Sequence, residues 1–379
     1  YIHVPFCTSV CPYCDFAVLI AGEERRRAFL RGVEREALMY SDLGLRFDTV
    51  YLGGGTPSSL RPDQLEGVLD SVGASLGIES DAEVFLEVNP EDVSPQAVAA
   101  WRESGVDTVS LGVQSFDDGV LKFLGRRHDA AAARKALDEL RAAGFHTVSI
   151  DLMYGFEGQT ATAWRGQLDE AVSRSVDHLS CYQLTFHGGT LFGRRLEQGL
   201  MTELDGDVQA ELFLLTHGAL ADAGYQGYEV SNFAAGAEHR SRHNLKYWTH
   251  DPYLGLGPAA HSFDGGRRWW NRRKLRQWQR DIDTDVRPVD GDEELTPGQL
   301  ALETVILGLR SAAGIDLAAF ERRFGIDLAS ANRWAVEGFV ADGFLTVQGT
   351  TLRPTVAGMA IADAMARTLD VSTTDDRRP

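Results

Sequence analysis

The sequence predicts an α/β fold, in which a partial (β/α)6 barrel is followed by a C-terminal, mainly helical, winged-helix-like domain. In the first half of the chain, six apolar, β-branched runs alternate with helical patterns, as in a parallel sheet with crossover helices. Polar or reactive side chains follow the end of each run, which favours a barrel whose strand ends converge on one site. Near the C-terminus, helices and one hairpin replace the strand–helix alternation.

The first half contains six predicted strands and five predicted helices. The strands cover residues 1–4, 49–52, 84–88, 108–113, 147–153 and 179–184. The helices between them cover residues 24–40, 62–76, 95–103, 130–143 and 161–173. Gly105 and Gly144 follow two of these helices, where a C-terminal glycine is expected.

The second half predicts an amphipathic helix over 204–223 and then a stretch rich in aromatic and histidine residues. From about residue 296 we expect helices at 300–309, 317–323 and 329–341, a hairpin at 344–352, and a helix at 356–365. The predicted domains are therefore a barrel (1–200), a barrel extension (201–290), a winged-helix-like domain (291–370) and a disordered tail (371–379).

Composition narrows the class of protein. The 379 residues are 44% hydrophobic and 24% charged, as in an ordinary globular protein. The formal net charge of −18 argues against nucleic-acid binding, which needs cations that neutralise phosphates. No apolar stretch approaches the length of a membrane span. We expect a cytoplasmic protein, where thiols stay reduced.

Three cysteines on one short loop are the most informative feature: Cys7, Cys11 and Cys14. They can hold three irons of a [4Fe–4S] cluster, which normally takes four cysteines, and leave one iron open for S-adenosylmethionine (SAM). The alternatives are a zinc knot, which needs a fourth ligand, and a disulfide, which leaves an odd thiol. Cys181 lies in an apolar run, and we expect it to be buried and inert.

Polar groups at the other predicted strand ends fit the same site. Gly53, Gly54 and Gly55 would let backbone amides approach a ligand, although a tight turn would also explain them. They match neither a Walker loop nor a dinucleotide-binding pattern. The remaining strand-end side chains are those of Glu87, Asn89, Gln114, Asp151, Thr185 and His187.

A basic and aromatic segment, Arg267–Lys274, stands out in this acidic chain. It has two interpretations, a strand followed by a solvated helix start, or a patch that binds carboxylates, anionic lipid or an acidic partner. The residues alone do not choose between them.

Taken together, these motifs resemble those of the radical SAM heme chaperone family HemW. Members of this family are related to the oxygen-independent coproporphyrinogen III oxidase. The matching motifs include Cys-x3-Cys-x2-Cys at 7–14, Gly-Gly-Gly-Thr-Pro at 53–57 and His-Asn-Leu-Lys-Tyr-Trp at 243–248. Further matches lie at 87–90, 110–116, 124–128, 151–155, 182–185, 229–233 and 253–257. One loop departs from the family pattern, because residues 155–160 read Gly-Phe-Glu-Gly-Gln-Thr where the family has Gly-Leu-Pro-Gly-Gln-Thr.

The resemblance implies a role for particular residues. It makes Cys7, Cys11 and Cys14 the cluster ligands and His243 a ligand of heme iron, with Tyr247 or Trp248 against the porphyrin. A histidine bonded to a backbone carbonyl is the alternative for His243. The implied SAM-contacting residues are Tyr1, Gly54, Gly55, Thr56, Glu87, Gln114, Arg126 and Asp151.

The hypothesis from the sequence is a heme chaperone that carries the cluster, SAM and heme. It would deliver heme to apo-proteins such as respiratory enzymes, with a peripheral membrane contact through Arg267–Arg273 and a homodimeric state as further expectations. The rivals are a radical SAM methyltransferase or cyclopropanase and an anaerobic coproporphyrinogen III oxidase. The oxidase motif has a further cysteine where this chain has Phe16. Whether the chain is an enzyme stays open.

Overall fold

The computed structural model describes residues 1–372, so most of the predicted tail lies outside the described residues. The chain forms two compact units that are discontinuous in sequence. Among the described residues, the first contains residues 1–205, 253–262 and 269–292, and the second contains residues 206–252, 263–268 and 293–372. The domain boundaries expected from the sequence stay predictions.

The first unit is built on six parallel strands. They lie in the order β1-β2-β3-β4-β5-β6, and each pairs with the next along the chain. Their bounds are β1 Ile2–Val4, β2 Arg46–Gly54, β3 Gly77–Val88, β4 Thr108–Gln114, β5 Thr147–Tyr154 and β6 His178–Gln183. Among the described residues β1 and β6 do not pair, so the sheet stays open. This confirms the predicted partial barrel.

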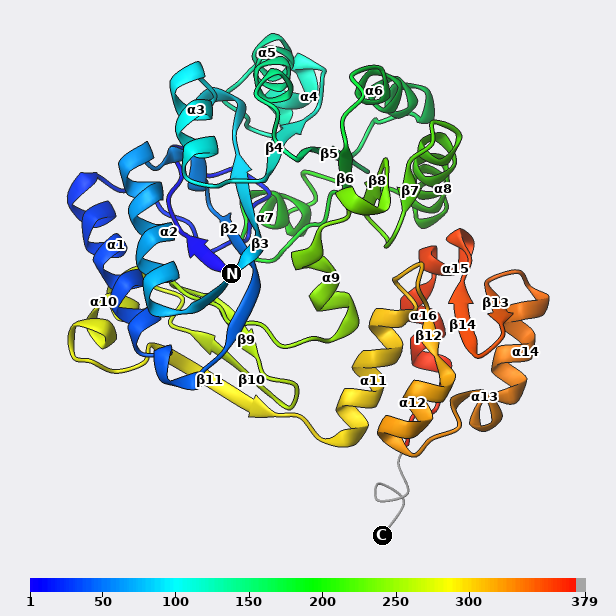
Figure 1. The fold of residues 1–379 in the computed structure, drawn as a ribbon. Coiled ribbons are helices and arrows are strands. Elements are labelled where there is room, and N and C mark those ends of the chain that lie inside the picture. The colour runs from blue at the N-terminus through cyan, green and yellow to red at the C-terminus, as the bar shows by residue number, and fades with distance from the viewer. Residues whose placement is uncertain (373–379) are drawn as a thin grey trace. The chain divides into compact units, whose positions relative to one another are not determined.

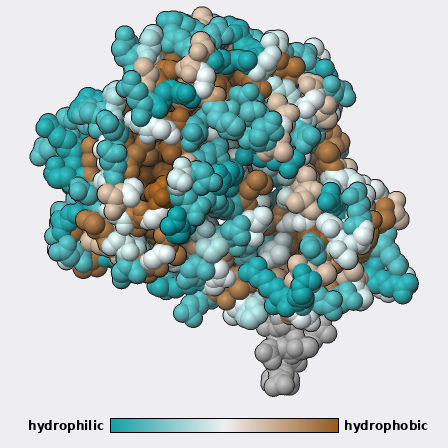
Figure 2. Space-filling model, in the orientation of Figure 1, coloured by the Kyte–Doolittle hydropathy of each residue, from teal (hydrophilic) through white to brown (hydrophobic). Residues whose placement is uncertain are grey.

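Five crossover helices lie in an arc outside these strands (Figure 1). They are α1 Glu23–Leu38, α2 Pro62–Ser75, α3 Pro95–Glu103, α5 Ala130–Ala142 and α6 Ala161–Ser173. Side chains of Ser94, Asp129 and Thr160 accept from backbone amides at the starts of α3, α5 and α6, where unpaired N–H groups need acceptors. Figure 2 shows mostly hydrophilic residues on the outside of this arc and hydrophobic residues inside it.

Two short helices, α4 Asp118–Phe123 and α7 Leu191–Glu197, were not expected from the sequence. Both follow strand ends of the barrel, α4 after β4 and α7 after β6. Helices of this length are too short for an apolar period to show. Short 3-10 turns lie at Ser41–Leu43, Pro57–Ser59, Pro90–Asp92 and, in the second unit, Ala237–His239.

The basic and aromatic segment forms a strand and then a helix, β10 Arg267–Asn271 and α10 Leu275–Asp283. Strand β10 lies between β9 His261–Phe263 and β11 Val289–Glu294. Helix α10 packs on α1, where a Cβ on Gly32 would lie 2.3 Å from the Trp278 ring. The small residue on α1 thus makes room for the fully buried indole.

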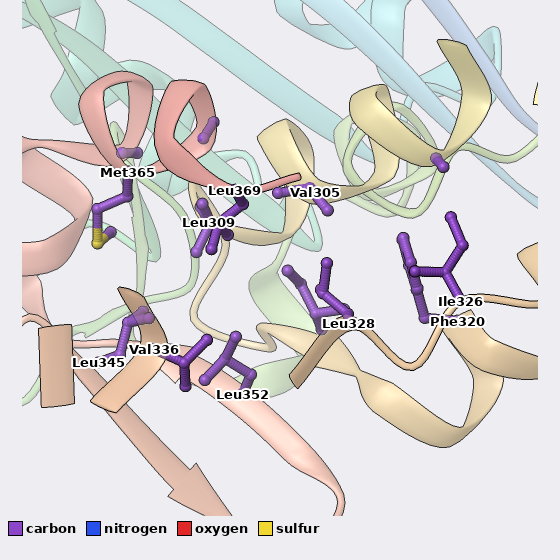
Figure 3. Close-up of a cluster of buried hydrophobic side chains, with 14 residues drawn as sticks. Val305, Leu309, Phe320, Ile326, Leu328, Val336, Leu345, Leu352, Met365 and Leu369 are labelled. Atoms are coloured by element: carbon purple, nitrogen blue, oxygen red, sulfur yellow. The ribbon is translucent and has the colours of Figure 1, made fainter. Parts of the chain in front are cut away.

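In the second unit, a helical bundle carries a winged hairpin. Its core gathers apolar side chains of the C-terminal elements, among them Leu309, Phe320, Leu328, Val336 and Leu352, which point toward one another in Figure 3. The elements are α8 Gly206–Asp222, β7 Gln226–Gly227, β8 Asn232–Ala234, α9 Arg242–Thr249, α11 Pro297–Gly308, β12 Ile315–Asp316, α12 Leu317–Phe324, α13 Leu328–Ala331, α14 Arg333–Ala341, β13 Leu345–Gln348, β14 Thr351–Pro354, α15 Val356–Ala360 and α16 Ala362–Thr368.

Two predicted C-terminal helices are each broken into two. The first breaks at Asn332, whose side-chain amide donates to the carbonyls of Leu328 (3.0 Å) and Asp370 (2.9 Å) and accepts from the Asp370 amide (2.6 Å). The second breaks at Ile361, between α15 and α16. Asn332 ties the helix break to a residue 38 positions away, so the local sequence could not reveal it.

Candidate functional site at the strand ends

The cysteine loop leaves β1 and is closed by backbone hydrogen bonds. The Leu19 amide donates to the Pro5 carbonyl (2.8 Å), the Cys7 amide donates to the Leu19 carbonyl (3.1 Å), and the Cys14 amide donates to the Cys11 carbonyl (3.1 Å). All three thiols are free and half-buried. The fold therefore holds the three sulfur atoms on one compact loop at the end of the first strand.

The thiols are near enough to influence one another. Burial, with smaller contributions from the charges of Cys11 and Cys7, raises the pKa of Cys14 to about 11. Burial also raises the pKa of Cys7, against a hydrogen bond from the Thr56 hydroxyl to its sulfur (3.4 Å). Metal binding requires thiolates, so a bound cation would release these protons.

The donor set fits a [4Fe–4S] cluster. Within residues 1–372, no three histidine, cysteine or acidic side chains converge to hold a single metal ion. A cubane does not need such convergence, because each cysteine binds a different iron. When bound, the cluster would supply the electron for reductive cleavage of SAM at the iron without a cysteine.

The glycine run at the end of β2 allows close packing against β1. A Cβ on Gly54, whose φ is +103°, would lie 2.4 Å from the His3 ring. A Cβ on Gly55 would lie 2.7 Å from the Val4 carbonyl oxygen, which accepts a hydrogen bond from the Gly55 amide. Both glycines are thus required by the approach of β1, whether or not they also face a ligand.

Two carboxyl groups lie on β3 and β5, the strands on either side of β4. Glu87 accepts from the Tyr51 hydroxyl (2.8 Å) and the Gly54 amide (3.0 Å), and Asp151 accepts from the Ser110 hydroxyl (3.0 Å). Burial raises the pKa of Glu87 to about 7, helped by the nearby charge of Asp151, and burial raises the pKa of Asp151 to about 6. A cation placed beside them would favour their ionised forms. The pair is therefore suited to an ammonium or sulfonium ligand.

Arg126 connects the cysteine loop to the rim, by which we mean the carboxyl ends of the parallel strands. Its guanidinium donates to the Cys11 sulfur (3.7 Å), the Asn89 side-chain oxygen (2.6 Å) and the Gly112 carbonyl (3.0 Å). Asn89 in turn donates to the Thr56 hydroxyl (3.1 Å), which donates to Cys7. One hydrogen-bonded chain thus joins two thiols of the cysteine loop to the ends of three strands.

Tyr1 and Gln114 complete the predicted set. The Tyr1 hydroxyl lies 3.0 Å from His3 Nδ1, and its ring lies 6.0 Å from the ring of Tyr51. Gln114 adopts a positive φ of 63° where the register of β4 and β5 shifts. Such a backbone is uncommon outside glycine and is often associated with function. Of the eight predicted SAM residues, Tyr1 precedes β1 and Asp151 lies within β5, whereas the others lie at the ends of β2 to β4 or in the segments that follow them.

Sequence reasoning missed several supporting residues. Tyr51 and Ser110 hold the two carboxyl groups, and the buried Tyr13 interacts with Arg126 and Cys11. Tyr51 had a weak signal, an aromatic residue two positions before the glycine run. The departure at 155–160 is a turn in which the Gln159 side chain accepts from the Gly155 amide (2.7 Å), and Glu157 is exposed.

His243 lies in the second unit, on α9. The Ser241 hydroxyl accepts from the Asn244 amide (3.1 Å) and starts the helix, which places His243 and Tyr247 one turn apart. His243 is buried, which lowers its pKa, and its Nε2 lies 2.8 Å from the Tyr247 hydroxyl. The imidazole is therefore neutral, the form that can bind iron, and one of its ring nitrogens is engaged by the phenol.

The arginines of the basic segment have partners within the protein. Arg268 pairs with Glu303 (2.6 Å) and Glu293 (3.3 Å). Arg272 pairs with Asp281 (2.9 Å), and Arg273 donates to the Asp15 carbonyl (2.5 Å). These contacts favour the structural interpretation, and the membrane contact stays a prediction. No helix among the described residues is long and apolar enough to span a membrane.

Known proteins resemble this chain in sequence and in fold. Residues 1–166 match the model of the Radical SAM superfamily, and residues 295–361 match the HemN C-terminal domain. The chain is 38% identical over 376 residues to the heme chaperone HemW of Mycobacterium tuberculosis, covering 97% of this chain and 94% of that protein. It is 33% identical to HemW of Bacillus subtilis over 86% of this chain and 87% of the relative. The chain belongs to the HemW family.

Other similarities agree with the HemW family. The mitochondrial radical S-adenosyl methionine domain-containing protein 1 of Mus musculus is 33% identical, covering 97% of this chain and 86% of that protein. The structure of coproporphyrinogen III oxidase (HemN) from Escherichia coli superposes with a TM-score of 0.82, covering 97% of this chain and 88% of that one. Its sequence identity of 21% supports a shared fold alone. This chain therefore shares the fold of that structure.

Proposed function

We propose that this protein is a heme chaperone, which binds a [4Fe–4S] cluster through Cys7, Cys11 and Cys14, SAM at the strand-end rim, and heme through His243. The observation that carries the heme assignment is the buried, neutral imidazole of His243 beside the Tyr247 hydroxyl on α9, in a chain of the HemW family. A neutral imidazole is the form that ligates heme iron.

In the first unit, the protein's own groups would hold and orient SAM. Glu87 and Asp151 offer carboxylates to its cationic groups, and Arg126 offers a guanidinium within reach of the cysteine loop. The hydrogen bonds from Tyr51 and Ser110 fix both carboxylates before the ligand arrives. Such preorganisation lowers the cost of ordering the site on binding.

The heme assignment is tested by haemin titration of the anaerobically reconstituted protein, followed in the Soret band. We expect saturable one-to-one binding that weakens at least about tenfold in His243→Ala. The exposed His146 provides the matched control, and His146→Ala should bind like the wild type. Equal binding by wild type and His243→Ala would contradict the assignment and favour a SAM-consuming enzyme.

The cluster assignment is tested by iron and sulfide analysis after reconstitution. We expect each of Cys7→Ser, Cys11→Ser and Cys14→Ser to lose most of its iron, since three ligands are the fewest that hold such a cluster here. The buried Cys181 is the control, and Cys181→Ser should load like the wild type. Iron loading by Cys14→Ser equal to that of the wild type would refute the ligand set.

The recipients and the assembly follow from the same proposal. The acceptors would be apo-proteins that require heme, such as respiratory enzymes, and the chaperone would act as a homodimer in the cytoplasm. Transfer of heme from the loaded protein to an apo-cytochrome, followed by the Soret shift, tests delivery. Light scattering with and without haemin tests the dimer. Haemin retained by the chaperone in the presence of excess acceptor would contradict delivery.

A further inference from the structure

A cavity of about 490 Å³ lies beside the cysteine loop in the first unit. Cys11 and Cys14 line it, together with residues of α4 and α7, the two helices that the sequence did not predict (Figure 1). None of the functional residues assigned above, other than these two cysteines, takes part in it. The cavity therefore needs its own explanation.

Three cations surround this cavity without an acidic partner. Lys122, Arg194 and Arg195 line it and are exposed, and no aspartate or glutamate does. Among residues 1–372 none of the three forms an ion pair, and Arg194 donates only to the Gly189 carbonyl (2.5 Å). In a chain with a net charge of −18, this is a local positive area.

Apolar side chains lie among the cations. Val10, Phe123 and Leu191 line the cavity and are 53%, 37% and 42% exposed. Exposed apolar groups surrounded by charged ones are typical of protein–protein interfaces. Cations on long, solvated side chains hold a small free anion weakly, because water and salt screen them. Several carboxylates presented together on one protein surface would be held more strongly.

Helix α7 and the turn that follows α4 contact the cysteine loop. The Phe192 amide on α7 donates to the Pro12 carbonyl (2.9 Å). A Cβ on Gly125, which follows α4, would lie 2.7 Å from the Pro12 ring. A protein bound to these helices would thus come close to Cys11 and Cys14, two of the proposed cluster ligands.

We propose that this surface docks an acidic one-electron carrier protein, which reduces the cluster. The carrier's redox centre would lose one electron and the cluster would gain it, with no bond formed or broken. The inference rests on the cluster of the proposed function. The negative charge of the rest of the chain would repel such a carrier elsewhere, so charge would orient it toward the cysteines.

The test compares two reductants on the anaerobically reconstituted protein. The rate of cluster bleaching is measured by stopped flow with an acidic flavodoxin, photoreduced to its hydroquinone. The amplitude of bleaching with excess dithionite shows whether the cluster is present and reducible. Loss of that amplitude in the wild type would contradict the proposed function, whereas the flavodoxin rates test the docking surface.

We expect the double variant Arg194→Glu/Arg195→Glu to slow reduction by flavodoxin about tenfold at low salt, with the dithionite amplitude unchanged. The wild-type rate should fall as salt is added, and the variant should lose this dependence. The matched control is Lys135→Glu/Arg165→Glu, two exposed cations on α5 and α6, which should react like the wild type.

Lys122→Glu on α4 provides an independent variant if the change on α7 disturbs the loop. This variant too should slow the reduction of the cluster by flavodoxin, while the amplitude of bleaching with dithionite stays unchanged. Equal flavodoxin rates in wild type and variants, or an equal slowing in the control, would overturn the inference. So would a loss of haemin binding with no change in reduction rate, which would make the cavity a site for heme carboxylates.

Discussion

Two regions of the first unit bury carboxyl groups, and they differ in what surrounds those groups. Glu36 on α1 is fully buried and accepts from three protein donors, the Gly257 amide (2.7 Å), the Asn271 amide group (2.6 Å) and the Trp278 indole (3.0 Å). Glu87, at the rim, is only half-buried and accepts from two.

The comparison separates a structural carboxyl from one that we propose to bind a ligand. Burial raises the pKa of Glu36 to about 8, higher than the values of about 7 for Glu87 and about 6 for Asp151. A raised pKa therefore does not by itself identify the functional site in this protein. The two kinds of carboxyl differ in accessibility, because Glu36 is enclosed by its donors whereas Glu87 and Asp151 are only half-buried.

The largest expected effect belongs to Glu36. Glu36→Ala should lower the free energy of unfolding by about 3–5 kcal/mol, because three buried donors would lose their acceptor. Urea unfolding of the apo-protein, followed by circular dichroism, measures it. The exposed Glu34 on the same helix is the control, and Glu34→Ala should change stability by less than about 0.5 kcal/mol. Equal stability of the two variants would remove the distinction between the regions.

An intermediate effect is expected at the rim. Glu87→Gln and Asp151→Asn should each weaken SAM binding by about 10- to 100-fold, with little change in stability. The two wild-type carboxyl groups have raised pKa values, so they lose protons as the pH rises through about 6 to 7. Since a cationic ligand favours ionised carboxylates, SAM affinity should rise from pH 5.5 to pH 8.

Calorimetry of the reconstituted protein at several pH values measures this rise. Each variant should retain a weaker dependence on pH, because one of the two titrating groups remains. An affinity that is independent of pH in the wild type would show that these carboxyl groups do not face the cation.

The smallest effect concerns Tyr247, which engages Nε2 of His243. If Nε2 binds heme iron, the phenol competes with the metal, and Tyr247→Phe should strengthen haemin binding by about 2- to 10-fold, the equivalent of one hydrogen bond. Haemin titration beside His243→Ala measures it. Weaker binding by Tyr247→Phe would mean that the hydroxyl supports the heme rather than competing with it.

The sequence predicted the six strands because their centres are apolar and β-branched. It placed β2 at 49–52 and β3 at 84–88, whereas the strands run over Arg46–Gly54 and Gly77–Val88. The added residues, such as Asp48 and Glu79, are polar and give no strand signal. Two pairs, Arg46 opposite Gly77 and Phe47 opposite Ile78, extend the strands there, and Asp48 and Glu79 lie in the register shift that precedes the pair of Thr49 and Glu83.

For the candidate site, the sequence was sufficient to predict which side chains take part, whereas their hydrogen-bond partners depend on the fold. Strand-end positions were sufficient to single out Glu87, Asp151 and the cysteines. The contact of Arg126 with Cys11 spans 115 positions, and the positive φ of Gln114 comes from a register shift between two strands. Neither can be inferred from local patterns, because both depend on how distant segments pair.

The position of Arg126 has a consequence for the order in which the two cofactors would bind. Its guanidinium contacts Cys11 on one side and the Asn89 and Gly112 oxygens of two strand ends on the other. Conversion of the neutral thiol into a metal-bound thiolate changes the charge that this guanidinium faces. The strand ends that would receive SAM are therefore sensitive to whether iron has been loaded. SAM would therefore find its binding pocket fully formed only after the iron–sulfur cluster has been loaded.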